Sequence, residues 1–293
     1  MAKVFRATDR RTGRLVAIKL LRLDAGIPDT RDRFAREIRL LERIDHDNCA
    51  RLLDHGVDGE TPFAVLELLV GSDLRDAMRG PLPASQVIAL TRQLVEALSV
   101  LHARDIIHRD VKAENLMLTR DANGRDRLVL VDFGAALPVG PTYDGPCVTK
   151  TAAGFVLGTP VAIPPEQLQG APVGVQTDLY AVGALMFELL TGEMPFVGDP
   201  AEILREKMQG RHPKLPPCVP KSLAMLVHSL MHPDPSLRLA SVRATLRALA
   251  FADVDLRRSR RPHTWHDLLG PRYSVVARSH TMVTSCSPDA RAR

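Results

Sequence analysis

The period of the hydrophobic pattern changes once along this chain, close to residue 71, and no other feature restricts the fold as much. Before that point short apolar runs are separated by turn residues, which predicts strands over 4–7, 15–20, 51–55 and 63–67. In this part residues 30–44 carry apolar side chains at helical spacing. Beyond it helical spacing prevails, and the predicted helices are 84–103, 178–191, 200–208, 221–231 and 240–250. The sequence therefore predicts an α+β fold, with a small, mainly antiparallel sheet carrying one helix, followed by a larger helical part.

The composition is that of a globular protein. The 293 residues are 45% hydrophobic and 25% charged, which excludes intrinsic disorder and low-complexity architecture. The longest apolar stretches, such as residues 181–187, are too short to span a bilayer, and no signal-peptide pattern opens the chain. The four cysteines, at positions 49, 147, 218 and 286, show no paired spacing for zinc or redox chemistry. We therefore expect a cytoplasmic protein with reduced thiols and no membrane span.

The formal net charge of +5 is concentrated near the end of the chain. Residues 251–293 contain eight arginines against four aspartates, which leaves residues 1–250 nearly neutral. A neutral body with 4% aromatic residues offers neither a basic patch nor a base-stacking surface, so nucleic acid is excluded as a partner. Residues 251–293 are predicted to be a basic, flexible tail that is either solvated chain or an interaction arm.

Two short motifs, separated by one apolar run, carry the chemistry. Residues 108–115 read His-Arg-Asp-Val-Lys-Ala-Glu-Asn, and residues 132–134 read Asp-Phe-Gly directly after the apolar run 128–131. In order and spacing they resemble the catalytic loop and the metal-binding motif of the serine/threonine protein kinases, particularly the bacterial ones. The resemblance covers residues 1–250 and implies a bilobal fold, with a small β-rich N-lobe and a larger α-helical C-lobe.

The resemblance implies that ATP and Mg²⁺ bind here and that the γ-phosphoryl group moves to a Ser or Thr hydroxyl. Asp110 would accept the hydroxyl proton, and Lys112 would neutralise the γ-phosphate. Asn115 and Asp132 supply hard oxygen ligands of the kind that Mg²⁺ prefers. His108 is predicted to be a packed structural histidine with no catalytic role.

A lysine on the second predicted strand is the candidate ligand of the α- and β-phosphates. Residues 16–19 read Val-Ala-Ile-Lys, and Glu37 on the following predicted helix stands where the resembling family places the partner carboxylate of this lysine. A salt bridge between Lys19 and Glu37 would fix the lysine rotamer and hold the helix in its active pose. Arg36 and Arg39 flank Glu37 and leave the helix register open to question.

The adenine ring is expected to lie between apolar side chains and a short hinge. Val4 and Ala17 would form the apolar walls, and Leu66 would be the gatekeeper residue before the hinge. The backbone carbonyl of Glu67 and the backbone amide of Leu69 would then bind the adenine edge.

Residues downstream of the metal-binding motif are expected to stabilise the fold. Residues 158–160, which include Thr159, and residues 164–166 resemble the end of a kinase activation segment, with Pro164 in place of the usual Ala or Ser. Glu166 would pair with Arg238, and Asp178 would support the backbone of the catalytic loop.

Two threonines are candidate phosphorylation sites. Because Arg109 precedes Asp110, we expect a buried guanidinium that lacks a partner until an anion arrives. Phosphorylation of Thr149 or Thr151 would supply that anion, adding about −1.5 to −2 charge and ordering the loop. The alternative is that both are ordinary polar residues of a loop.

The chain departs from the resembling family at its start. Residues 1–5 align with the last part of the glycine-rich loop, so that Ala2 takes the third glycine position and the first strand is missing. The strand at Val4 would then be an exposed sheet edge. Either the true start lies upstream, or the protein lacks the loop and binds ATP more weakly, because backbone amides for the β- and γ-phosphates are lost.

The predicted organisation is a kinase domain over residues 1–250, with an N-lobe over 1–67, a hinge over 67–71 and a C-lobe over 72–250. The predicted function is that of a serine/threonine protein kinase in signal transduction, with protein substrates and transient self-association for autophosphorylation as partners. Two alternatives stay open: a pseudokinase or scaffold with impaired ATP binding, and a small-molecule phosphotransferase of related fold. Lys112, Thr159 and residues 164–166 favour a peptide-binding platform over the latter.

Overall fold

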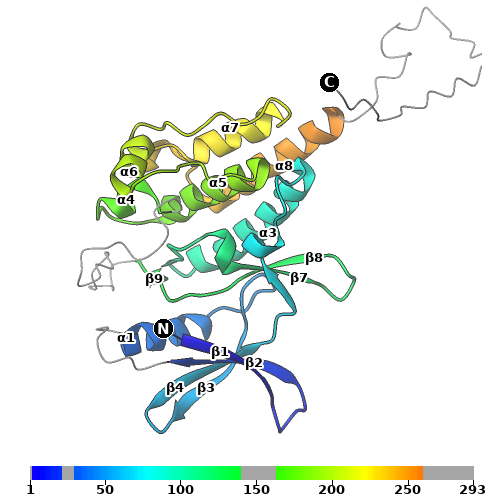
Figure 1. Ribbon diagram of the computed structural model, residues 1–293, viewed down its shortest axis with the longest axis vertical. Coiled ribbons are helices and arrows are strands. Elements are labelled where there is room, and N and C mark those ends of the chain that lie inside the picture. Colours follow the sequence, from blue (N-terminus) through cyan, green and yellow to red (C-terminus); the bar gives the residue numbers. More distant parts are fainter. Residues whose placement is uncertain (1, 22–29, 140–162, 260–293) are drawn as a thin grey trace, which may run out of the picture. The chain divides into compact units, whose positions relative to one another are not determined.

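The computed structural model describes residues 2–21, 30–139 and 163–259 of the chain. The chain divides into two units, residues 1–256 and residues 257–293, and the first contains all the site residues discussed below (Figure 1). Within this unit a β-rich part precedes a helical part, as the change of hydrophobic period predicts.

The β-rich part is one antiparallel sheet with a helix packed on it (Figure 1). Its strands are β1 (Ala2–Thr8), β2 (Leu15–Leu21), β3 (Leu52–Asp58) and β4 (Thr61–Glu67), in the order β1-β2-β4-β3, and its helix is α1 (Thr30–Leu41). The β2–β4 register places Ala17 opposite Leu66 and Lys19 opposite Ala64. A small core of Leu21, Phe34, Ile38 and Ala64 joins α1 to the sheet.

The helical part contains two small sheets and several helices. Its strands are β5 (Gly71–Asp73), β6 (Ile106–Ile107), β7 (Leu116–Arg120), β8 (Asp126–Leu130) and β9 (Leu137–Pro138). Its helices are α2 (Leu74–Ala77), α3 (Ala84–His102), α4 (Pro165–Leu168), α5 (Val175–Thr191), α6 (Pro200–Met208), α7 (Lys221–Leu230) and α8 (Val242–Ser259), with the 3-10 turns η1 (Ala113–Asn115) and η2 (Pro235–Leu237). Strands β5, β7 and β8 form one sheet, and β6 pairs with β9.

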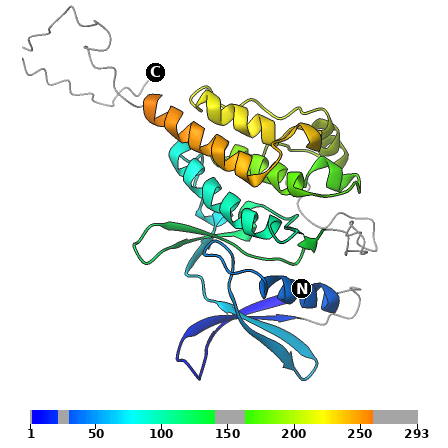
Figure 2. The same ribbon diagram turned by 180° about the vertical axis from the view of Figure 1, so that it is seen from behind.

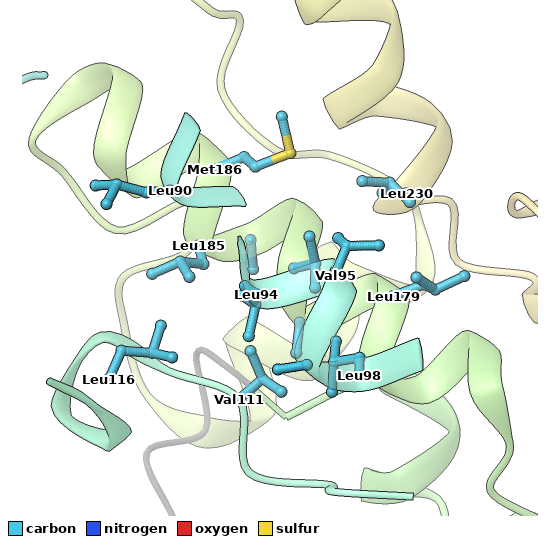
Figure 3. Packing of buried hydrophobic residues seen from close by; sticks show 14 of the residues in the cluster. Leu90, Leu94, Val95, Leu98, Val111, Leu116, Leu179, Leu185, Met186 and Leu230 are labelled. Atoms are coloured by element: carbon cyan, nitrogen blue, oxygen red, sulfur yellow. The ribbon is translucent and has the colours of Figure 1, made fainter. Parts of the chain in front are cut away.

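Helix α5 is buried on nearly every side, because its residues from Thr177 to Leu190 are almost all apolar. Figure 3 shows Leu94 and Leu98 of α3 packed close to Leu179 and Leu185 of α5. On the opposite side Gly183 lies so close to α7 that a Cβ would come within 2.7 Å of the Leu230 side chain. The helix ends at Gly192, whose φ of 76° suits glycine.

The segment between α1 and β3 fastens the two parts together. The Ala50 N–H donates to the Leu130 carbonyl (2.9 Å), and the Leu130 N–H donates to the Asn48 carbonyl (2.8 Å). The Asn48 side chain also donates to the Leu128 carbonyl at 2.7 Å. These bonds fix the end of β8, and so the residues that follow it up to Asp132.

Several predicted bounds differ from the observed ones. Helix α1 ends at Leu41, three residues earlier than predicted, and α8 runs to Ser259, past residue 250 where the tail was predicted to begin. Ala252 and Leu256 of α8 are buried, which is why the helix continues. Figure 2 shows α8 beside α3 and α7, where Ser222 Oγ donates to Asp255 Oδ2 at 2.6 Å. Among the helices of the described residues, none has the length and apolar character needed to cross a bilayer.

Candidate active site

The lysine of β2 faces two carboxylates. Its Nζ lies 2.5 Å from Glu37 Oε1 and 3.4 Å from Asp132 Oδ1. Burial alone would lower the pKa of Lys19, but the two carboxylates outweigh it and raise the pKa, so the ammonium stays charged. The predicted salt bridge with Glu37 is therefore present.

The register of α1 brings Glu37 inward. Glu37 is buried, whereas Arg39 is exposed and Arg36 is half-buried. This removes the question that the flanking arginines raised, because Glu37 is the residue of this turn that reaches Lys19.

Asp132 adopts an unusual backbone conformation after β8. Its φ is 63°, in the left-handed region, and its Oδ1 accepts the Gly134 N–H at 3.2 Å. Although burial opposes it, the Lys19 ammonium and the Gly134 N–H lower the pKa of Asp132. The carboxylate is thus ionised and half exposed, as a metal ligand requires.

The catalytic-loop motif forms a second cluster. Lys112 Nζ lies 2.9 and 2.8 Å from the two carboxylate oxygens of Asp110. The Asn115 side-chain amide donates to the backbone carbonyl and to Oδ2 of Asp110, both at 2.8 Å. Asp110 therefore has a fixed orientation, because the side chains of Lys112 and Asn115 both donate to its carboxylate.

A buried aspartate holds the backbone of this loop. Asp178 of α5 accepts the N–H groups of His108 (2.9 Å) and Arg109 (2.8 Å), as predicted. Its Oδ2 also contacts Nε2 of His102 at 2.7 Å, a partner that the sequence motifs did not indicate. Burial would raise the pKa of Asp178, but these hydrogen bonds lower it. Arg109 itself has a φ of 67°, which the two bonds help to maintain.

The two other catalytic-loop residues with predicted roles are both buried. The His108 ring packs edge-on against Phe133, with ring centroids 5.2 Å apart, and burial lowers the pKa of this histidine. The Arg109 Nε donates to the Ala135 carbonyl at 2.8 Å. The prediction that the Arg109 guanidinium waits without a partner is therefore wrong, because the backbone after the Asp-Phe-Gly motif supplies one.

The donor set fits a Mg²⁺ ion held jointly with phosphate oxygens. Both amide hydrogens of Asn115 are used on Asp110, so its oxygen Oδ1 remains for a metal, and Asp132 adds an ionised carboxylate. Within the described residues no group of three or more His, Cys, Asp or Glu side chains could hold a metal ion. Mg²⁺ in nucleotide sites needs only one or two protein ligands beside the phosphates.

The predicted adenine-binding residues lie along β1, β2 and the end of β4. Ala17 is half-buried opposite Leu66, whose side chain packs against the helical core. Val4 lies on the edge strand β1 and is 63% exposed. Leu69 belongs to the connection from β4 to β5.

Glu67, at the start of the predicted hinge, has a partner that the sequence did not suggest. Its Oε1 lies 3.2 Å from NH2 of Arg127 in β8, and its N–H donates to the Arg51 carbonyl at 3.0 Å. Arg127 also donates to the Asp47 carbonyl at 2.7 Å. The Glu67 side chain is therefore held by the segment before β3 and by β8.

The predicted pair Glu166–Arg238 is a buried bidentate ion pair. The two guanidinium nitrogens of Arg238 lie 2.7 and 2.8 Å from the two oxygens of Glu166. Nearby, the buried Lys207 Nζ donates to the Ile163 carbonyl at 2.5 Å, a contact that no motif indicated. Thr149, Thr151 and Thr159 lie outside the described residues.

The family model for the protein kinase domain matches residues 1–248. Serine/threonine-protein kinase pkn3 of Myxococcus xanthus is 35% identical over 269 residues, which cover 88% of this chain and 49% of that protein. PknL of Mycobacterium tuberculosis is 36% identical over 201 residues (68% and 48%), and PknB of Mycobacterium leprae is 37% identical over 206 residues (68% and 32%). This chain spans about half of the length of the first two and a third of the last.

Proposed function

Since this chain belongs to the protein kinase domain family, among serine/threonine protein kinases, we propose that it transfers the γ-phosphoryl group of Mg·ATP to Ser or Thr hydroxyl groups of proteins. The observation that carries this proposal is a pair of charged clusters whose backbones are joined where the Val131 N–H donates to the Asn115 carbonyl at 2.9 Å. One contains Lys19, Glu37 and Asp132, and the other contains Asp110, Lys112 and Asn115.

In this proposal Asp110 positions the acceptor hydroxyl and takes its proton. Lys112 already contacts both Asp110 oxygens, so it can neutralise a phosphate that approaches the acceptor. Lys19 is held by Glu37 with its charge intact and is available to the α- and β-phosphates. Bound Mg²⁺ would neutralise phosphate charge and orient the leaving group, and Asn115 and Asp132 are the residues that would hold it.

We further propose that phosphorylation of Thr149 or Thr151 activates the enzyme. Arg109 keeps a buried cation next to Asp110, and its Nε bond to the Ala135 carbonyl ties this cation to the segment that leads to both threonines. A phosphate on either residue would add about −1.5 to −2 charge and could form charge-assisted hydrogen bonds with the guanidinium.

We also propose that the protein is cytoplasmic and that two copies of it pair transiently. ATP is supplied inside cells, and the described cysteines Cys49 and Cys218 form no disulfide, which supports a cytoplasmic location. Transient pairing of two copies would let one kinase phosphorylate the other, and nucleic acid has no role.

The test is transfer of radiolabelled phosphate from ATP to a general protein substrate. Asp110→Asn should lower kcat by about 10²–10⁴-fold, because it removes the general base while keeping the shape of the side chain. The matched control is Asp58→Asn at the exposed end of β3, which should transfer phosphate at the unaltered rate. Equal rates in both variants would refute the mechanism. An unaltered protein that neither transfers phosphate nor is stabilised by Mg·ATP would be the scaffold of the alternative prediction.

A further inference from the structure

An arginine fills the space between two carboxylates beside the catalytic loop. Arg75 of α2 has its Nε 3.0 Å from Oε1 of Glu114, and its NH1 pairs with Glu188 of α5. The Glu188 side chain is 6% exposed, whereas those of Arg75 and Glu114 are 32% and 40% exposed. One guanidinium therefore neutralises two acids from different elements, one of them buried.

The same place contains a small cavity that reaches the catalytic residues. Its walls include Val111, Leu185 and Met194, and its volume of about 20 Å³ leaves room for about one water molecule. Lys112 also lines it, and Lys112 contacts both carboxylate oxygens of Asp110. The cavity thus lies next to the residue that would hold the acceptor hydroxyl.

A bound peptide would pass close to these acids. The acceptor hydroxyl must come within hydrogen-bond reach of Asp110, and an extended chain advances only about 3.3 Å per residue. Side chains flanking the acceptor would therefore reach Glu114, which lines the same cavity as Lys112. Without Arg75, the two carboxylates would attract an arginine or lysine there.

With Arg75 in place, a second cation gains nothing at this position. To bind Glu188, it would have to displace the Arg75 guanidinium, and it would then only replace one ion pair with another. The positive charge of Arg75 also repels an incoming cation, and repulsion of this kind is a usual source of specificity.

We propose that Arg75 is a specificity determinant, which occupies an anionic subsite beside the catalytic loop and so prevents the enzyme from preferring basic side chains next to the acceptor. The enzyme then binds substrates with basic and with uncharged side chains at that position about equally. This proposal rests on the proposed function in one respect, namely that a protein segment binds beside Asp110.

The test measures peptide binding without nucleotide, so that it does not depend on transfer. Labelled serine peptides, each with one alanine near the acceptor replaced by arginine, are titrated with protein and followed by fluorescence anisotropy. The unaltered protein should bind arginine and alanine peptides with Kd values within about twofold of each other. Arg75→Met should bind the arginine peptide at one flanking position at least about tenfold more tightly than its alanine counterpart.

Arg79→Met is the matched control. It removes the same charge four residues away, from an exposed side chain that does not line the cavity, and should behave like the unaltered protein. An arginine preference in the unaltered protein, or none in Arg75→Met, would overturn the proposal.

A second variant covers the case in which Arg75→Met does not fold because Glu188 is left charged and buried. Arg75→Met/Glu188→Gln removes that charge and leaves Glu114 as the attracting group. It should prefer arginine by about threefold, and a preference equal to that of the unaltered protein would again overturn the proposal. Failure of phosphate transfer with these binding ratios intact would refute the proposed function and not the role of Arg75.

Discussion

Replacing Arg238 with methionine should destabilise the protein severely. The Arg238 side chain is fully buried and donates to both oxygens of Glu166 and to three backbone carbonyls, those of Gln176, His232 and Pro233. Methionine fills part of the volume but leaves the Glu166 carboxylate buried and unpaired. Removing one partner of a buried ion pair costs about 3–5 kcal/mol of unfolding free energy.

This loss can be converted into a melting temperature. For a domain of this size about 1 kcal/mol corresponds to a shift of about 2–4 °C, so Arg238→Met should melt about 6–20 °C lower than the unaltered protein. Thermal unfolding followed by fluorescence measures the shift directly. Arg247→Met, at an exposed position of α8, is the control and should change the stability by less than about 0.5 kcal/mol.

A double variant tests whether the unpaired charge is the cause. Glu166→Gln in the Arg238→Met background removes the charge and should recover about 1–3 kcal/mol, since residues of one ion pair are strongly coupled. Two results would contradict this explanation. One is that Arg238→Met melts no lower than Arg247→Met. The other is that Glu166→Gln lowers the free energy of unfolding of Arg238→Met by as much as it lowers that of the unaltered protein.

Three further measurements address other residues of the site. Burial lowers the pKa of Lys207 from 10.5 to about 7, so above pH 7 the unfolded chain binds more protons than the folded protein. The free energy of unfolding, measured in urea, should therefore rise by up to about 1.4 kcal/mol per pH unit from pH 7 to about pH 9. Lys207→Met should abolish this rise. Because the pKa of Asp178 is lowered from 3.8, this carboxylate stabilises the fold above pH 3.8, and the stabilisation is lost as the pH falls below that value. Asp178→Asn should lower the free energy of unfolding by about 1–3 kcal/mol at pH 7. Its stability should also fall less steeply with decreasing pH in the acid range. Glu37→Gln removes one charge-assisted hydrogen bond from Lys19, and such a bond contributes about 1.5–3 kcal/mol. We therefore expect kcat/KM for ATP to fall about 10- to 150-fold. Glu42→Gln, at an exposed position, is the control and should leave kcat/KM unchanged.

The contacts that the sequence predicts well are those between residues with fixed places in spaced motifs. Lys19 stands on a predicted strand and Glu37 on a predicted helix, and the family resemblance paired them, which the ion pair confirms. Glu166 and Arg238 were paired in the same way, through the family resemblance. The helix predicted over 240–250 was ended too early. Leu249, Ala252 and Leu256 continue the helical spacing, but the arginine-rich run after them suggested a tail.

Contacts between segments without a motif could not be predicted. The Glu67–Arg127 pair joins residues 60 positions apart, and the packing of two separate elements decides whether the side chains meet. Arg75 and His102 likewise sit on helices whose local sequence gives no sign of a distant carboxylate. The left-handed backbone of Asp132 is also set by its surroundings, since aspartate alone does not favour this conformation.

The two carboxylates that face Lys19 depend on one short connection. Glu37 lies on α1, and the chain after α1 forms a parallel bridge from Cys49 to Leu130, two residues before Asp132. A movement that displaced Cys49 would therefore also displace Leu130 and the end of β8. The thiol in the bridge adds packing and no reactivity, because burial raises the pKa of Cys49 to about 12 and keeps the sulfur protonated. Backbone hydrogen bonds outside the site thus connect the segment after α1, which carries Glu37, to the strand that leads to Asp132.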